Sequence, residues 1–316
     1  MFFSFTAMFC NDIMNKKDKG DFDMNKKLTM GKLILNLIML IVSLTYILPL
    51  LLMIAISFSS ETSISDFGYK LIPESWCLDA YKLVFKNPTQ IINSYKTTVS
   101  YAILGTVLSV IVQSLMAYPL ARNNYKRKKF ITIYLMITMF FSGGLVPSYI
   151  MNTQYLRLGN SFWIYIFPSL MSAWNVILFK TFFKALPEGL IEAAKLDGAS
   201  EYKIYGTIVI PLSTPIIACI GFTTLLGKWN DWNTSLLYIR KPELYSLQYL
   251  LQRIINEADY ITQMQGTAME AFVGKELPSE TMRYATAVIA AGPMMVIFPF
   301  FQKYFAEGLV VGSVKG

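Results

Sequence analysis

Six long runs without a charged side chain divide this sequence and restrict what it can fold into. A helix needs about 20 predominantly apolar residues to cross the hydrocarbon core of a bilayer. The runs of about that length or more cover residues 33–60, 97–121, 130–156, 158–179, 204–227 and 284–302. The sequence therefore predicts an all-α polytopic membrane protein with six transmembrane helices.

Composition agrees with a membrane protein and excludes several kinds of chemistry. Hydrophobic residues make up 54% of the chain and charged residues only 15%, whereas soluble domains carry about 25% charge. The chain has no His, which removes Ser-His-Asp triads and His-ligated metals. Cys10, Cys77 and Cys219 have neither metal-ligand spacing nor an evident disulfide pairing. We therefore expect no catalytic, cofactor or metal site.

The distribution of charge predicts how the chain lies in the membrane. With the N-terminus in the cytoplasm, the inner segments hold 17 basic and 9 acidic residues, and the outer segments hold 11 of each. The whole basic excess then lies inside, as the positive-inside rule expects. The basic turn at 122–129 is explained by this topology, so we expect no nucleic-acid partner. Both termini are predicted to be cytoplasmic.

This topology gives a simple division of the chain. Residues 1–32 form a cytoplasmic tail, 33–302 the six-helix transmembrane domain, and 303–316 a second cytoplasmic tail. The first tail has an apolar start whose positive charges follow it, the reverse of a secretory signal. The true start codon, Met1 or Met24, stays open. The transmembrane domain includes a cytoplasmic loop at 186–203 and an outer loop at 228–283, which has a predicted helix at 245–256.

Two interruptions of the apolar runs are open to interpretation. Phe141-Ser142-Gly143-Gly144-Leu145-Val146-Pro147 either breaks the third span or ends it at the outer surface. Pro211 and Pro215 should perturb the start of the fifth span. The six predicted spans contain no Asp, Glu, Lys or Arg, which argues against carriers that use intramembrane ionisable groups.

The cytoplasmic loop predicts two short helices that meet at a sharp turn. Pro187 suits a first helical position, and Gly198 suits the left-handed residue that closes a helix. Ser200 can cap the second helix. The first helix would present one small apolar face, made by Leu186, Leu190, Ala193 and Ala194.

The same loop resembles the EAA motif of ABC importer permease subunits. The matching residues are Glu192-Ala193-Ala194-x-x-Asp197-Gly198-Ala199, followed by Ile208, Pro211 and Pro215. Tyr205 stands in place of the usual Phe, and Ile210 in place of the usual Leu. Residues 141–149, 229–232 and 312–316 are similar to the maltose-permease-like carbohydrate branch, especially its oligosaccharide members in Gram-positive bacteria.

The resemblance implies a type I ABC importer permease in the bacterial cell membrane. Such a subunit is not an enzyme: two partner ATPase subunits bind ATP and Mg. A second homologous permease, as a heterodimer, and a lipid-anchored or periplasmic solute-binding protein complete the implied complex, which sits in membrane lipid and imports a sugar or oligosaccharide. The residues implied to contact the ATPases are Glu192, Ala193, Ala194, Asp197, Gly198, Ala199 and Lys315.

Residues around the fifth span are candidates for the solute pathway. On a helix, Trp229 and Trp232 would form one stripe and Asn230 and Asn233 an adjacent one, able to stack on sugar rings and bind hydroxyls. An aromatic belt at the bilayer interface explains the tryptophans equally simply. Two further polar candidates, which could instead pack helices, are Asn175 and Gln113.

Two other functions remain open from the residues alone. A secondary transporter or channel would need no ATPase, and a permease of the same family could carry another solute. The particular sugar, the identity of the partner permease and ATPase, and whether this subunit contacts solute are not specified by the sequence.

Overall fold

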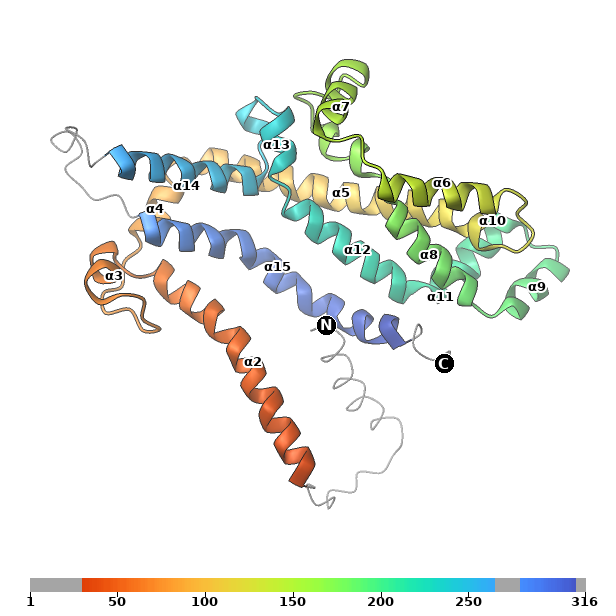
Figure 1. The fold of residues 1–316 in the computed structure, drawn as a ribbon, viewed down its shortest axis with the longest axis horizontal. Helices are drawn as coiled ribbons and strands as arrows, with labels where there is room; N and C mark the ends of the chain where they lie inside the picture. Colours follow the sequence, from red (N-terminus) through yellow and green to blue (C-terminus); the bar gives the residue numbers. More distant parts are fainter. Residues whose placement is uncertain (1–29, 265–278, 311–316) are drawn as a thin grey trace. The chain divides into compact units, whose positions relative to one another are not determined.

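The computed structural model describes residues 30–264 and 279–310, which form a chain of helices (Figure 1). In these residues there is no β-strand, only one antiparallel bridge between Ser59 and Trp76. Contacts divide the chain into two compact units. The first contains 93–246 and 297–310, and the second contains 30–92, 247–264 and 279–296.

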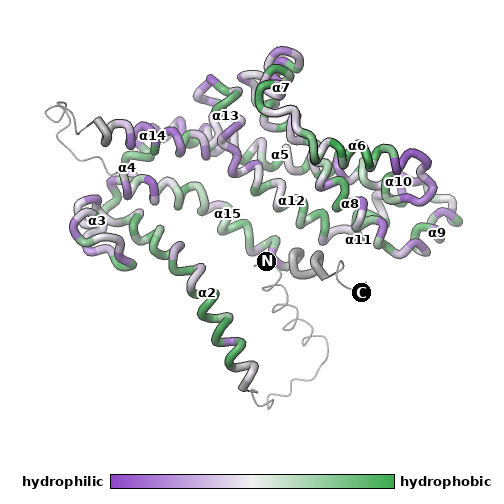
Figure 2. The backbone as a smooth tube through the Cα atoms, in the orientation of Figure 1, coloured by the Kyte–Doolittle hydropathy of each residue, from purple (hydrophilic) through white to green (hydrophobic). Residues whose placement is uncertain are grey.

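Three helices are long and apolar enough to cross a membrane. α2 is Met30–Ser57, α5 is Pro88–Ala121 and α15 is Ser279–Val310, and each contains a sufficiently apolar window. Figure 2 shows hydrophobic residues along most of α2, whose apolar side chains are largely exposed, as expected of a helix that contacts lipid. α15 continues past residue 302, so the predicted second tail begins as helix.

Three further helix pairs qualify only as bent spans. α6 (Lys128–Phe140) is followed at 112° by α7 (Leu145–Ile150) and π-helix η1 (Met151–Tyr155). The 3₁₀-helices η2 (Phe162–Tyr165) and η3 (Phe167–Ser169) meet α8 (Ala173–Ala185) at 50°. The continuous helix formed by α10, η4 and α11 meets α12 (Thr214–Trp229) at 79°. Counting each pair once gives up to six spans.

The first bend lies at the glycine-rich segment whose role the sequence left open. α6 ends at Phe140, and Gly144 takes a φ of +86° before α7 begins. A side chain is disfavoured in that conformation. The glycine-rich segment therefore breaks the helix, and residues 130–156 do not form a single straight span.

The third bend follows from two prolines. α10 is Glu201–Ile204, η4 is Tyr205–Val209 and α11 is Ile210–Leu212. Pro215 has no N–H to donate to the carbonyl of Pro211. The hydroxyl of Thr214 donates to that carbonyl at 2.8 Å instead. The predicted perturbation at the start of the fifth span is thus a sharp bend.

The second unit joins the loop between α2 and α5 to the start of α15. The loop contains α3 (Glu61–Phe67) and α4 (Asp79–Val84). The carboxylate of Glu61 accepts the backbone N–H groups of Glu280 and Thr281 at 3.0 and 3.1 Å. An acidic group suits the positive end of a helix dipole. The helix predicted at 245–256 is present in this unit as α14 (Leu247–Met264).

The first unit contains the bent spans and the loop at 186–203. Figure 1 shows α7 and α13 (Asn233–Tyr238) at one end of this unit, and α9 (Glu188–Leu196) and α10 at the other. η5 (Pro242–Leu244) completes the unit. One apolar cluster draws on α5, α6, α8, α9, α10, η4 and α12, with the buried residues Ala117, Tyr118, Leu120, Leu135, Val176, Phe179, Phe183, Ile191, Ile204, Val209 and Ile220.

Candidate functional site

The loop between α8 and α12 folds into the two short helices that its sequence indicates. α9 begins at Glu188, so Pro187 precedes the first helical residue instead of occupying it. Ile191 anchors α9 in the core of the first unit, whereas Leu190 and Leu196 are exposed. The apolar face predicted for α9 is divided in the structure: Leu186 and Ala194 pack against the apolar cluster, whereas Leu190 and Ala193 are exposed.

The turn between α9 and α10 has the predicted geometry. Gly198 takes a φ of +76°, and the N–H of Ala199 donates to the carbonyl of Ala194 at 2.9 Å, closing the end of α9. The Ser200 hydroxyl then accepts the N–H of Lys203 at 3.4 Å and caps α10. The left-handed glycine and the serine cap are both confirmed.

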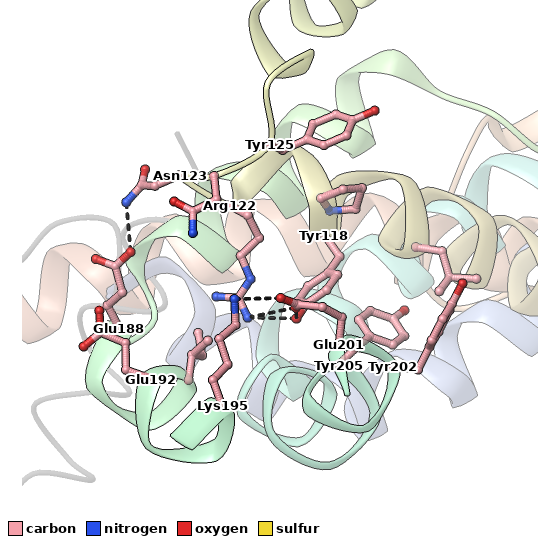
Figure 3. A pocket seen from close by; sticks show the side chains of 14 residues that line it. Tyr118, Arg122, Asn123, Tyr125, Glu188, Glu192, Lys195, Glu201, Tyr202 and Tyr205 are labelled. Carbon is pink, nitrogen blue, oxygen red and sulfur yellow. Dashed lines mark hydrogen bonds and ion pairs between the residues drawn. The ribbon is translucent and has the colours of Figure 1, made fainter. Parts of the chain in front are cut away.

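A charged network joins this turn to the end of α5. Arg122 donates to the Tyr118 hydroxyl at 2.8 Å, and that hydroxyl donates to Glu201. Lys195 forms an ion pair with the other carboxylate oxygen of Glu201 at 2.7 Å. Figure 3 shows these side chains converging from α5, α9 and α10. Hydrogen bonds to ionised partners are the stronger kind, so the network fixes the start of α10 against α5.

The four acidic side chains of the loop fall into two groups. Glu188 accepts the Asn123 side chain at 2.8 Å, and Glu201 belongs to the network above. Within the described residues, Glu192 and Asp197 have no side-chain hydrogen bond or ion pair, and both are exposed. The two carboxylates of the EAA-like motif are therefore available to a partner, while the two outside the motif hold the loop in place.

A cavity of about 600 Å³ opens beside the carboxylates of Glu188, Glu192 and Glu201 (Figure 3). It lies between the end of α5, the basic turn, α9 and α10. Its lining is partly apolar and partly charged, and comprises Leu115, Tyr118, Pro119, Arg122, Asn123, Asn124, Tyr125, Glu188, Ile191, Glu192, Lys195, Glu201, Tyr202 and Tyr205.

The predicted ATPase contacts divide by exposure. Glu192, Ala193, Asp197 and Gly198 are exposed. Ala194 and Ala199 are partly buried against the apolar cluster, so they seat the loop on the unit. Lys315 lies outside the described residues. Contact of these residues with an ATPase stays a prediction.

The predicted tryptophan and asparagine stripes do not form on one helix. α12 ends at Trp229, and Asn230, Asp231 and Trp232 turn the chain before α13 begins at Asn233. Trp229 is buried beside an aromatic ring of α5, whereas Trp232 is 46% exposed. The single-helix prediction is wrong because the helix ends inside the motif. Solute contact by these residues stays a prediction.

The other two candidates lie next to the break in the fourth span. Gln113 is buried, and its side-chain N–H donates to the carbonyl of Leu170 at 2.8 Å. The backbone N–H of Asn175 donates to the hydroxyl of Ser172, which caps α8. Gln113 thus satisfies a carbonyl that the broken helix leaves free. A role for either residue in the solute pathway is still a prediction.

Sequence reasoning missed Lys228, a buried basic residue near the end of α12. α12 extends through Lys228, whose amine donates to the carbonyl of Tyr165 at 3.3 Å and to the Ser169 hydroxyl. A Cβ on Gly105 would lie 2.9 Å from that amine. Lys228 lies just beyond the predicted span at 204–227, but α12 continues past the end of that span and includes it. Lys228 thus satisfies one backbone carbonyl and one hydroxyl beside the break in the fourth span.

Comparison with known proteins identifies the family. Residues 97–311 match the family described as binding-protein-dependent transport system inner membrane component. The chain belongs to this family. It is a permease, a transport subunit and not an enzyme.

Its relatives cover nearly its whole length. Protein LplC of Bacillus subtilis is 36% identical over 270 residues, which are 85% of this chain and 90% of LplC. YtcP of the same species, named as a polygalacturonan/rhamnogalacturonan transport system permease protein, is 35% identical and matches over 88% of this chain and 96% of its own. A bacterial ABC transporter involved in alginate import contains a chain with a TM-score of 0.72, 26% identity, and coverage of 86% of this chain and 95% of its own.

Proposed function

We propose that this permease is the membrane-spanning subunit of an ATP-driven importer of sugars or oligosaccharides. The pairing pattern of the loop supports this most directly: the EAA-like carboxylates Glu192 and Asp197 have no partner among the described residues, while Glu188 and Glu201 are paired. The relatives named above support a saccharide as the solute, as do relatives named for arabinooligosaccharides and maltodextrin.

In this proposal the loop couples ATP hydrolysis to the pore. Two ATPase subunits, which bind ATP and Mg, dock on α9 from the cytoplasm, and their closure moves α9. The network at Arg122 and Glu201 ties the turn that follows α9 to α5, so that movement reaches the bundle through a rigid connection. A second, homologous permease completes the pore, and an extracellular solute-binding protein delivers the saccharide. This chain contributes six spans, with both termini in the cytoplasm.

Reversing the charge of either unpaired carboxylate tests the coupling assignment. We expect Glu192→Lys and Asp197→Lys to reach the membrane at near-normal abundance, because neither side chain forms a hydrogen bond or an ion pair with the rest of the described chain. Saccharide uptake should fall about tenfold or more, since an ion pair across an interface that loses one partner typically costs about 2–5 kcal/mol. The measurements are uptake, ATPase co-purification and binding-protein-stimulated ATP hydrolysis.

The matched control is Glu188→Gln, which changes a carboxylate that the chain itself pairs; coupling should persist. Normal uptake and stimulation in both charge-reversed variants would remove the coupling assignment. Uptake by the purified permease alone, driven by an ion gradient, would replace the proposal with a secondary transporter.

The proposed orientation can be tested with thiol labelling in intact cells. Single cysteines at 122–129 and 188–203 should resist a membrane-impermeant maleimide, because both segments are assigned to the cytoplasm. The native Cys77, which is partly exposed in the first outer loop, should react. Permeabilised cells should label at all three places. Labelling of 122–129 in sealed cells together with protection of Cys77 would reverse the topology.

A further inference from the structure

A second cavity, of about 680 Å³, lies at the opposite end of the first unit from the coupling loop. Its walls are α7 with η1, the η2–η3 segment and α13. These walls include residues of the glycine-rich segment at 141–149 and of α13, which follows the motif at 229–232. A cavity of this size is in the range of small-ligand sites.

Polar groups without partners converge on this cavity. Asn233 and Thr234 line it, and neither side chain forms a hydrogen bond with the described residues. Asn152, which is 8% exposed, donates from its side-chain nitrogen to the hydroxyl of Tyr238 at 3.2 Å. Its amide oxygen has no partner in the part of the chain that the structure describes. Amides and hydroxyls of this kind can donate to and accept from sugar hydroxyls.

The walls are held in place by contacts behind the lining. The ring of Tyr238 stacks on Tyr149 with centroids 5.5 Å apart. The carboxylate of Asp231 caps the start of α13 at the N–H of Thr234, at 3.0 Å. Ser235, on the buried side of α13, forms a hydrogen bond with Tyr165. The polar groups that face the cavity are therefore preorganised, which lowers the cost of binding.

The rest of the lining is apolar and uncharged. Apart from Ser148, whose hydroxyl donates to the carbonyl of Gly144, leucine, isoleucine, methionine and proline side chains complete the walls. Among the described residues, no Asp, Glu, Lys or Arg lines the cavity. Apolar walls can pack against the C–H face of a sugar ring while its hydroxyls meet the amides. A sugar ring would be bound here through its hydroxyl groups and its C–H face, and not through a carboxylate group on the sugar.

We infer that this cavity is a saccharide subsite on the outer side of the permease, which holds one end of the solute after the binding protein releases it. The inference rests on the proposed function and specifies where this chain would contact the sugar. It assigns the contacts to Asn152, Asn233 and Thr234.

The test is protection of a cysteine in the cavity, in the complete transporter. Cys10, Cys77 and Cys219 are first replaced by Ser, and Thr234→Cys is introduced. Uptake of maltotetraose, raffinose and trigalacturonate by the parent transporter identifies a transported probe. At about twice its dissociation constant, that probe should slow maleimide labelling of Thr234→Cys about threefold. Raising the salt from about 0.1 to about 0.5 M should leave the protection unchanged, because charge is not used.

The matched control is Leu236→Cys, on the same helix but outside the cavity, where labelling should not respond to saccharide. Asn233→Leu should weaken the protection at Thr234→Cys. If the parent transporter takes up none of the three saccharides, the proposed function is overturned. If uptake is normal but saccharide does not protect Thr234→Cys, only the subsite is overturned. The same holds if the unliganded binding protein protects the cysteine equally well, or if the protection is lost at high salt.

Discussion

Gly198→Val is expected to reduce saccharide uptake about tenfold or more while leaving the permease in the membrane at near-normal abundance. The reason is the backbone and not steric contact: φ is +76°, and an added Cβ would meet no atom within 4 Å. A left-handed conformation costs a residue with a side chain about 1–2 kcal/mol, and a β-branched residue is a particularly poor fit. The end of α9 should therefore open, and the position of α9 should become variable.

A series of substitutions separates this cause from others. Gly198→Asn should retain most of the uptake, because Asn tolerates the left-handed region. The uptake of Gly198→Ala should lie between that of Gly198→Asn and that of Gly198→Val. Gly189→Ala is the matched control inside α9, where an added Cβ also meets nothing within 4 Å and φ is not positive. It should keep full activity and stabilise α9 slightly. The measurements are uptake and binding-protein-stimulated ATP hydrolysis; equal losses at both glycines would contradict the backbone explanation.

Lys228→Met is expected to destabilise the permease by about 1–3 kcal/mol, the cost of leaving buried polar groups without a hydrogen-bond partner. The amine that is lost donates to the Tyr165 carbonyl and the Ser169 hydroxyl, at the break in the fourth span. Thermal unfolding of the detergent-purified complex should show a lower midpoint. Lys184→Met, at an exposed position of α8, is the control and should unfold as the parent does.

A double-mutant cycle with Gly105 makes this prediction specific. Gly105→Ala places a Cβ 2.9 Å from the Lys228 amine, so it should destabilise the parent permease. In the Lys228→Met background the flexible thioether can move aside, and the same substitution should cost less. Residues in contact are expected to show such coupling. Additive effects, or an unchanged midpoint for Lys228→Met, would mean that the amine does not hold the broken span.

The sequence alone determined the features that depend on neighbours along the chain. Long apolar runs predict membrane spans, and these spans must be helical because a bilayer offers the backbone no hydrogen-bond partners. The helix at 188–196, its closure at Gly198 and the Ser200 cap follow from hydrogen bonds over three to five residues and from one glycine. The EAA-like residues could likewise be identified from the sequence, because they recur at a fixed spacing within one short segment. The resemblance to the EAA motif rests on this local pattern.

Only the tertiary structure decided the features that join distant parts of the chain. Lys228 donates to a carbonyl 63 residues away, and Asn152 meets Tyr238 across 86; no periodicity in the sequence reports such pairs. Burial also chose Ile191, and not Leu190, to anchor α9. Glu201 is paired because Tyr118 and Arg122, at the end of α5, lie beside it in the folded chain, whereas Glu192 has no such neighbour among the described residues. Local chemistry fixes the helices and turns, but the free energy of burial and of pairing polar groups depends on which surfaces meet in the folded chain.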